Sequence, residues 1–281
     1  RIEDIDSSRA EAEDGVVAVY TAEDLDEAGV PGEIPRIYRV PNLIEATHPV
    51  LAREKVTYQG KPVAVVVAED RYTAHNAADL VDVEYERLET VSNPVDAMDE
   101  GAPTIREEVD DNVAFSWETG DEDDVEEQFA DAAKVYDLEL ENQRIIPNAI
   151  EPRCALAEYD AVSEQLTVHI PSQQPFVHQS IMAGVLDHPQ RKVRIKAPNI
   201  GGGFGSKSMF YPDETLTAFC AMQLERPVKW VETRGEAFQA DEHGRGHVIR
   251  AKAGVDDDGR LCGLRVRTYC GIGGEVGSKG C

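Results

Sequence analysis

The stretch Ile195–Glu214, which reads IKAPNIGGGFGSKSMFYPDE, has the composition of a loop that brings its backbone against a ligand. Consecutive glycines lose the most backbone entropy on folding, so they are retained mainly where the chain needs positive φ or a close approach. Amides without side chains beside them can point at an anion or an oxo group. The candidate residues are Gly201, Gly202, Gly203, Phe204 and Gly205, and Lys207 follows them. A flexible turn is the plain alternative.

Two nucleotide-binding patterns fail on this loop. A phosphate-binding loop reads GxxxxGK[ST], and Gly201–Ser208 supplies the final Lys-Ser but has Ser206 where the second glycine belongs. The dinucleotide pattern GxGxxG fails at the same serine. The strand before a P-loop is buried on both faces, whereas Val193–Lys196 alternates apolar and charged residues. A P-loop-like nucleotide-binding protein is therefore the third-ranked interpretation.

The chain is strongly acidic. Its 281 residues include 54 acidic and 28 basic side chains, a net charge of −26. The acids are spread along a sequence with 41% hydrophobic residues, which indicates a folded protein with an acidic surface rather than a disordered tail. Nucleic acid is excluded as a partner, because phosphate contacts need a basic face.

We expect the stability of this protein to depend on salt, as in a halophilic source. Self-repulsion at this charge destabilises the compact state, and at 1 M salt the screening length falls to about 3 Å. The midpoint of unfolding should therefore rise between 0.1 M and 2 M KCl. Equal midpoints at the two salt concentrations would contradict the expectation.

Cysteine usage indicates a reducing, cytoplasmic setting. The five cysteines are odd in number and irregularly spaced, and no CxxC pair is present, so a disulfide framework, zinc site or iron–sulfur site within this chain is not expected. His243 and His247 have the spacing of a zinc pair on a helix, but the glycines between them disfavour a helix. The sequence contains no run of 18 apolar residues, so it predicts no membrane-spanning helix. Its charged first residues do not form a secretory signal.

The sequence pattern predicts an α+β fold in two parts. Residues 1–101 form the first unit, 102–120 a polar linker, and 121–281 the second unit. Predicted strands of the first unit are 16–20, 56–58, 63–69 and 81–85, with helices at 22–28 and 71–80 and a turn or short helix at 93–98. Predicted strands of the second unit are 134–141, 155–159, 166–170, 193–196, 228–231, 247–255 and 260–268. Its helices are 125–133, 176–186 and 214–224.

Three segments become informative together. They are Asn142–Tyr159 (NQRIIPNAIEPRCALAEY), Pro171–Pro175 (PSQQP), and the glycine loop followed by RPVKWVETRGEAF at Arg226–Phe238. In this order they resemble the molybdenum-binding large subunit of the xanthine dehydrogenase and aldehyde oxidase family, and most closely its aerobic carbon-monoxide-dehydrogenase-type branch. Residues 1–101 resemble a partial α/β-hammerhead domain, and 121–281 the first part of the molybdopterin-binding α+β domain.

The resemblance implies a molybdenum–molybdopterin cofactor, in its cytosine dinucleotide form, without direct metal ligands from this chain. By analogy the amide of Gln173 contacts an oxo ligand, with Gln174 as the alternative if the register slips by one. The backbone N–H of Phe204 matches the second contact, and Gly202, Gly203 and Gly205 permit close approach. Amides suit this role because they donate hydrogen bonds without adding charge.

The resemblance also implies hydroxylation with oxygen from water, and electron transfer to FAD and Fe–S partners. The partners would be an FAD-binding medium subunit and a 2Fe–2S small subunit, in a dimer of heterotrimers. Ser208 stands where purine-oxidising members have glutamate, which disfavours purines. The family's catalytic glutamate lies beyond Cys281, and no cysteine matches the copper-binding loop. We therefore expect a chain truncated at both ends, inactive alone, or a non-catalytic scaffold piece as the alternative; carbon monoxide, aldehydes and N-heterocycles stay open as substrates.

Overall fold

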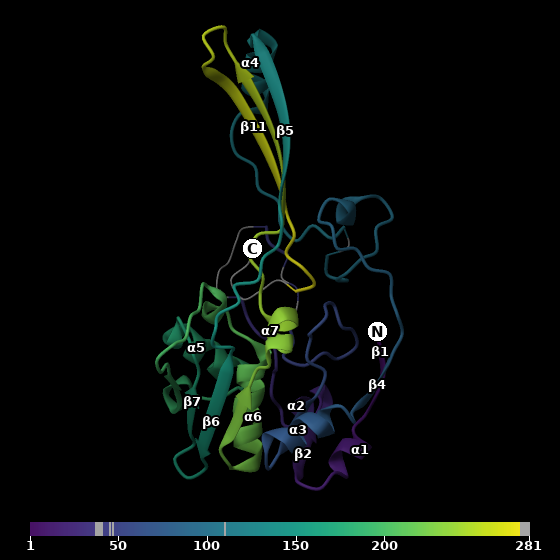
Figure 1. The fold of residues 1–281 in the computed structure, drawn as a ribbon, viewed down its shortest axis with the longest axis vertical. Helices are drawn as coiled ribbons and strands as arrows, with labels where there is room; N and C mark the ends of the chain where they lie inside the picture. The colour runs from purple at the N-terminus through teal and green to yellow at the C-terminus, as the bar shows by residue number, and fades with distance from the viewer. Residues whose placement is uncertain (37–41, 45, 47, 110, 276–281) are drawn as a thin grey trace.

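The computed structural model describes residues 1–36, 42–44, 46, 48–109 and 111–275 (Figure 1). The strands are β1 Ile2–Asp6, β2 Val16–Tyr20, β3 Val65–Ala68, β4 Asp82–Tyr85, β5 Lys134–Asn142, β6 Cys154–Asp160, β7 Gln165–His169, β8 Val193–Lys196, β9 Val228–Val231, β10 His247–Val255 and β11 Leu261–Cys270. The α-helices are α1 Ser8–Glu11, α2 Ala22–Glu27, α3 Arg71–Ala78, α4 Glu122–Asp131, α5 Pro175–Val185, α6 Pro212–Leu224 and α7 Arg234–Ala240. Three 3₁₀ turns are η1 Asp96–Met98, η2 Gln190–Lys192 and η3 Ser206–Ser208.

The first part of the chain forms two small antiparallel sheets. β1 pairs with β4, and β2 pairs with β3. Helix α3 begins as predicted, because the Asp70 side chain accepts hydrogen bonds from the N–H groups of Tyr72 and Thr73. The strand predicted at Val56–Tyr58 is wrong: these residues pair with no strand and run as irregular chain. β1 and α1 were not predicted.

A four-stranded sheet in the order β8-β7-β6-β9 organises the second part. β7 and β8 run parallel, joined by a crossover through α5, while the other pairs are antiparallel. The predicted β8 is confirmed with its bounds, and its Arg194 and Lys196 are exposed as the alternating pattern requires. The glycine loop leaves the end of β8 and leads through η3 into α6.

The larger hydrophobic core cluster contains residues from both parts of the molecule. Leu25 and Val50 of the first part belong to the same buried cluster as Leu166 of β7 and Phe219 of α6. The Tyr20 ring meets the Phe219 ring edge-on at a centroid distance of 5.3 Å. The two parts therefore pack as one body, although residues 102–120 contain no helix or strand among those described.

A three-stranded sheet projects from this body (Figure 1). Its order is β11-β10-β5, and both pairs are antiparallel. The strands predicted at 247–255 and 260–268 form a hairpin that turns at Asp257-Asp258-Gly259, where Gly259 takes a φ of 80° and its N–H donates to the Asp256 carbonyl at 3.0 Å. β11 continues to Cys270, beyond the predicted end at Thr268. We call the sheet with α4 the arm.

The segment after β11 returns to the first part of the molecule. The Glu275 carboxylate lies 2.8 Å from the Lys61 ammonium and 3.0 Å from the Arg106 guanidinium. The Lys61 side chain is 1% exposed, so this pair neutralises a buried cation. None of the described helices combines the length and apolarity that a membrane crossing requires.

Candidate functional site

The glycine loop adopts a backbone that few other sequences tolerate. Gly202 and Gly205 have φ values of 98° and 96°, and Phe204 between them has a φ of 50°. A non-glycine residue in the left-handed region is uncommon and marks a constrained site. The Phe204 side chain is 77% exposed, so burial of its ring does not explain the conformation.

Gln173 lies directly against the loop. Its N–H donates to the Lys207 carbonyl at 2.9 Å, which ties the turn between β7 and α5 to η3. A Cβ added at Gly203 would lie 2.6 Å from the Gln173 side-chain oxygen. Gln173 is exposed, and its side-chain amide forms no hydrogen bond with any described residue. Gln174, the alternative by one register, instead occupies the N-cap of α5, and its N–H donates to Ser172 Oγ at 2.9 Å.

Glu151 holds both ends of the loop, a role that the sequence analysis missed. One of its oxygens, Oε2, accepts from the Gly201 N–H at 2.7 Å and from the Lys207 ammonium at 2.7 Å. Burial opposes ionisation of Glu151, but the hydrogen bonds and charge of Lys207 and Gly201 outweigh it and lower the pKa of this carboxyl. Because the buried ammonium of Lys207 is paired with Glu151, it is not free to bind phosphate as a P-loop lysine does.

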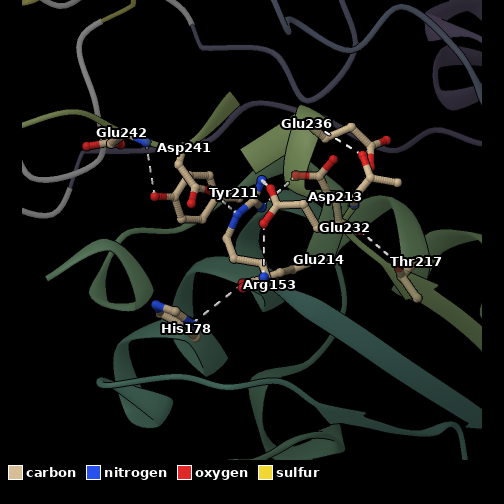
Figure 2. Close-up of polar contacts among 11 residues, drawn as sticks. Arg153, His178, Tyr211, Asp213, Glu214, Thr217, Glu232, Glu236, Asp241 and Glu242 are labelled. Carbon is tan, nitrogen blue, oxygen red and sulfur yellow. Dashed lines mark hydrogen bonds and ion pairs between the residues drawn. The ribbon is translucent and has the colours of Figure 1, made fainter. Parts of the chain in front are cut away.

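Arg153, two residues further on, is the centre of a buried ionic network (Figure 2). Its guanidinium contacts three carboxylates that come from separate parts of the chain. They are Asp213 at 2.7 Å, Glu232 at 2.6 Å and Asp241 at 2.5 Å. Although burial lowers it, these acids and Tyr211 raise the pKa of Arg153 well above its usual range, so the guanidinium stays charged.

The Arg153 network aligns the segments on either side of the loop. The Tyr211 ring, at the N-cap of α6, stacks 3.8 Å from the guanidinium carbon. The main chains of Arg153 and Glu232 also bond, since the Glu232 N–H donates to the Arg153 carbonyl at 3.1 Å. The Arg153 side chain thus holds together the start of β6, the start of α6 and the end of β9. Glu151 lies two residues before Arg153, so the same network also fixes its position.

Glu214 and His178 lie beside this network on α6 and α5 (Figure 2). Complete burial raises the pKa of Glu214 to about 8, against the opposing charge of Arg153. The His178 Nδ1 lies 3.6 Å from Glu214 Oε2, and its Nε2 lies 3.4 Å from the Ser208 carbonyl. These two side chains therefore connect α6 with η3, the turn that follows the glycine loop.

Replacing Glu214 with Gln is expected to flatten the pH dependence of stability between pH 4.5 and 8. In this window the folded Glu214 holds a proton that the unfolded chain has released, so the free energy of unfolding falls as pH rises. One proton gives a slope of about 1.4 kcal/mol per pH unit. Denaturant unfolding at pH 5, 6.5 and 8 in 2 M KCl measures the difference. Glu84→Gln, at an exposed position of β4, is the control, and parallel profiles for wild type and E214Q would contradict the assignment.

The sequence contained a signal for part of what was missed. The Glu-Pro-Arg triplet at Glu151–Arg153 stands directly before β6, inside a segment that carries the family resemblance, but its charged residues were given no role. Helix α7 was also missed, yet Thr233 and Glu236 form the capping box that Thr-x-x-Glu predicts. Among the described residues, no group of three or more His, Cys, Asp or Glu side chains is arranged to hold a metal ion.

Comparison with known families identifies the class of protein to which this two-part α+β fold belongs. The family model for the molybdopterin cofactor-binding domain matches residues 105–278, and the model for the aldehyde oxidase and xanthine dehydrogenase a/b hammerhead domain matches residues 1–89. The chain belongs to the xanthine dehydrogenase and aldehyde oxidase family of molybdenum-binding large subunits. Its fold is confirmed as a hammerhead domain followed by part of the molybdenum-binding domain.

Curated relatives place the chain near one branch of this family. It is 34% identical over 285 residues to the carbon monoxide dehydrogenase large chain of Hydrogenophaga pseudoflava, covering 97% of this chain and 35% of the relative. It is 32% identical over 267 residues to the nicotine 6-hydroxylase large subunit of Paenarthrobacter nicotinovorans, covering 94% and 32%. The chain thus spans about a third of the length of these two relatives.

Solved structures agree with this placement. Reconstituted CO dehydrogenase from Oligotropha carboxidovorans superposes with a TM-score of 0.88 and 33% identity, over 95% of this chain and 34% of that one. Quinoline 2-oxidoreductase from Pseudomonas putida 86 gives a TM-score of 0.88 and 30% identity, over 95% and 34%. The resemblance inferred from the motifs is therefore confirmed at the level of family and fold.

Proposed function

We propose that this chain forms part of the catalytic large subunit of a molybdenum hydroxylase, and that Gln173 and the glycine loop contact the molybdenum–molybdopterin cofactor. The observation that carries the proposal is the position of Gln173 against Gly203, where even a methyl group would collide with the amide oxygen. Two segments about thirty residues apart in the sequence meet there with an exposed, unpaired amide between them.

The residues present fit such a cofactor. An oxo group needs neutral hydrogen-bond donors, and the Gln173 amide supplies two N–H groups without charge. The N–H of Phe204 is a second donor, because no described residue accepts a hydrogen bond from it. Gly205 has open space where a Cβ would stand, and Gly203 leaves room for the Gln173 amide. Gly202 lets the Phe204 ring and Ala149 pack against the loop backbone.

When bound, the cofactor supplies two-electron oxidation of substrate with oxygen from water. This chain's own residues would position it: Glu151 and Lys207 fix the loop ends, and Gln173 and Phe204 orient the oxygen ligands. The substrate class is carbon monoxide, an aldehyde or an N-heterocycle. The names of the relatives support carbon monoxide and N-heterocycles, and the name of the hammerhead family model supports aldehydes. Ser208, at the position where purine-oxidising members have glutamate, disfavours a purine.

The proposal includes partners and setting. The partners are an FAD-binding medium subunit and a 2Fe–2S small subunit, assembled with this subunit as a dimer of heterotrimers. The cofactor is the cytosine dinucleotide form, and the protein works in a cytoplasmic, high-salt environment. The boundary at residues 102–120 remains a prediction within this proposal. Because the chain spans about a third of its relatives, a non-catalytic scaffold that associates with a separate chain is the second candidate.

The molybdenum content of the protein, purified in high salt from its own source, tests the proposal. Near-stoichiometric molybdenum, together with any large-subunit polypeptide that copurifies, is the expected result. A folded chain with no molybdenum, alone or with its partners, would favour the scaffold. Nucleotide binding by that folded chain would instead support the interpretation as a P-loop-like nucleotide-binding protein.

A further inference from the structure

The arm has two chemically different faces. Strand register places three residues of each strand side by side on one face, in the rows Tyr136–Ala253–Leu264, Leu138–Ala251–Val266 and Leu140–Ile249–Thr268. None of these nine side chains is charged, in a protein of net charge −26. We call these nine residues the open face.

Helix α4 covers the opposite face near the tip of the arm. Its Phe129 packs where a Cβ on Gly254 or Gly263 would lie only 3.1 Å from the ring. Arg250 and Arg265 project from that face and pair with Glu139 and with acids of α4. Charge and a covering helix therefore occur on one side of the sheet alone.

The open face has no cover among the described residues. Tyr136, Leu138, Leu140, Leu264 and Val266 are each between 47% and 55% exposed. Contiguous apolar surface of this kind marks an interaction site. β5 and β11 are also the edges of the sheet, so their outer backbone groups are open to pairing within the described chain.

We propose that the open face is covered by the polypeptide that corresponds to the remaining two-thirds of the large subunit. This inference rests on the proposed function. The relatives are about three times as long as this chain, so they carry the extra polypeptide that such a surface requires. An uncharged face with open edges is typical of a permanent interface, whereas separable subunits meet through more polar surfaces.

A second copy of the chain fits less well. Two copies would bring together bodies that each carry a charge of −26, and this repulsion opposes their association.

Photocrosslinking in the native host tests the assignment. p-Benzoylphenylalanine replaces Leu138 or Val266 on the open face, and Asp137 on the opposite face is the matched control position. We expect crosslinks from the first two positions to peptides of large-subunit sequence absent from this chain's 281 residues, whether joined to it or separate, and none of these from position 137. Crosslinks to a second copy, to the FAD or Fe–S subunits, or to nothing would overturn the proposal.

A variant pair adds a readout that does not depend on the probe. Leu138→Asp with Val266→Asp should lower recovery of the remaining large-subunit polypeptide at least tenfold, while Asp137→Asn leaves it unchanged. Recovery is measured by pull-down of this chain. If the remaining polypeptide is continuous with it, limited proteolysis first cuts the connection between the two parts. Molybdenum measured in the same preparations separates the failures: molybdenum without the crosslink overturns only the arm assignment, and the crosslink without molybdenum overturns only the proposed function.

Discussion

Replacing Arg153 with Met should lower the free energy of unfolding by about 3–5 kcal/mol, the loss expected when one partner is removed from a buried ion pair. The guanidinium is 1% exposed and Glu232 is fully buried, so the substitution leaves acids without a counter-charge in a dry site. Met fills much of the arginine volume, so the loss reports charge and hydrogen bonds rather than a cavity. Denaturant unfolding in 2 M KCl measures it.

The matched control is Arg250→Met on the arm. Arg250 also pairs with a glutamate, Glu139, but both side chains are about half exposed. Surface pairs contribute about 0–1 kcal/mol, so this variant should resemble wild type. An R153M protein within 1 kcal/mol of wild type would mean that the three acids around it are neutral or hydrated. Arg153→Lys should fall between the two, because it keeps the charge and loses the planar fork.

Local signals predicted much of the fold. The helix that begins at Arg71, the paired strands β10 and β11 and the alternating strand Val193–Lys196 each depend on signals within a few residues, and each was confirmed. Val56–Tyr58 shows the limit of such signals. Its residues favour a strand, but a strand forms only with a partner, and none of the neighbouring segments supplies one.

The ionic network could not be predicted from local pattern. The partners of Arg153 lie 60, 79 and 88 residues away in the sequence, at the starts and ends of other elements. Nothing in their own neighbourhoods distinguishes Asp213 or Asp241 from the many surface acids of this chain. The acidic composition that predicts salt dependence therefore also conceals the few carboxylates that hold the interior.

The candidate site was predicted in a different way. Gln173 and the glycine loop were brought together by family resemblance, and the structure places them in contact. Their supports, Glu151 and Lys207, were visible in the sequence but had no assigned role. A glycine-rich motif predicts which backbone groups are exposed. The side chains that hold this backbone in place come from distant segments, so they can be identified only once the fold is known.

Replacing Gly203 with Ala should lower molybdenum content roughly tenfold, the size of effect seen when groups around a metal are displaced. The added methyl group would lie 2.6 Å from the Gln173 amide oxygen and 2.8 Å from its amide carbon, so the side chain must swing away from the loop. Gln173 is exposed and flexible, and Gly203 does not have a positive φ, so the fold absorbs the change. The free energy of unfolding should change by less than about 1 kcal/mol.

Molybdenum per protein in the assembled enzyme, with unfolding measured in parallel, checks this separation of binding from stability. Gly184→Ala is the matched control, because it adds the same methyl group where no atom lies within 4 Å. Gln173→Ala should lower molybdenum as G203A does, and the double variant should lose little more, since both changes remove the same amide from the loop. Full molybdenum in G203A would show that the Gln173 amide does not contact the cofactor, and additive losses in the double variant would show that the two residues act apart.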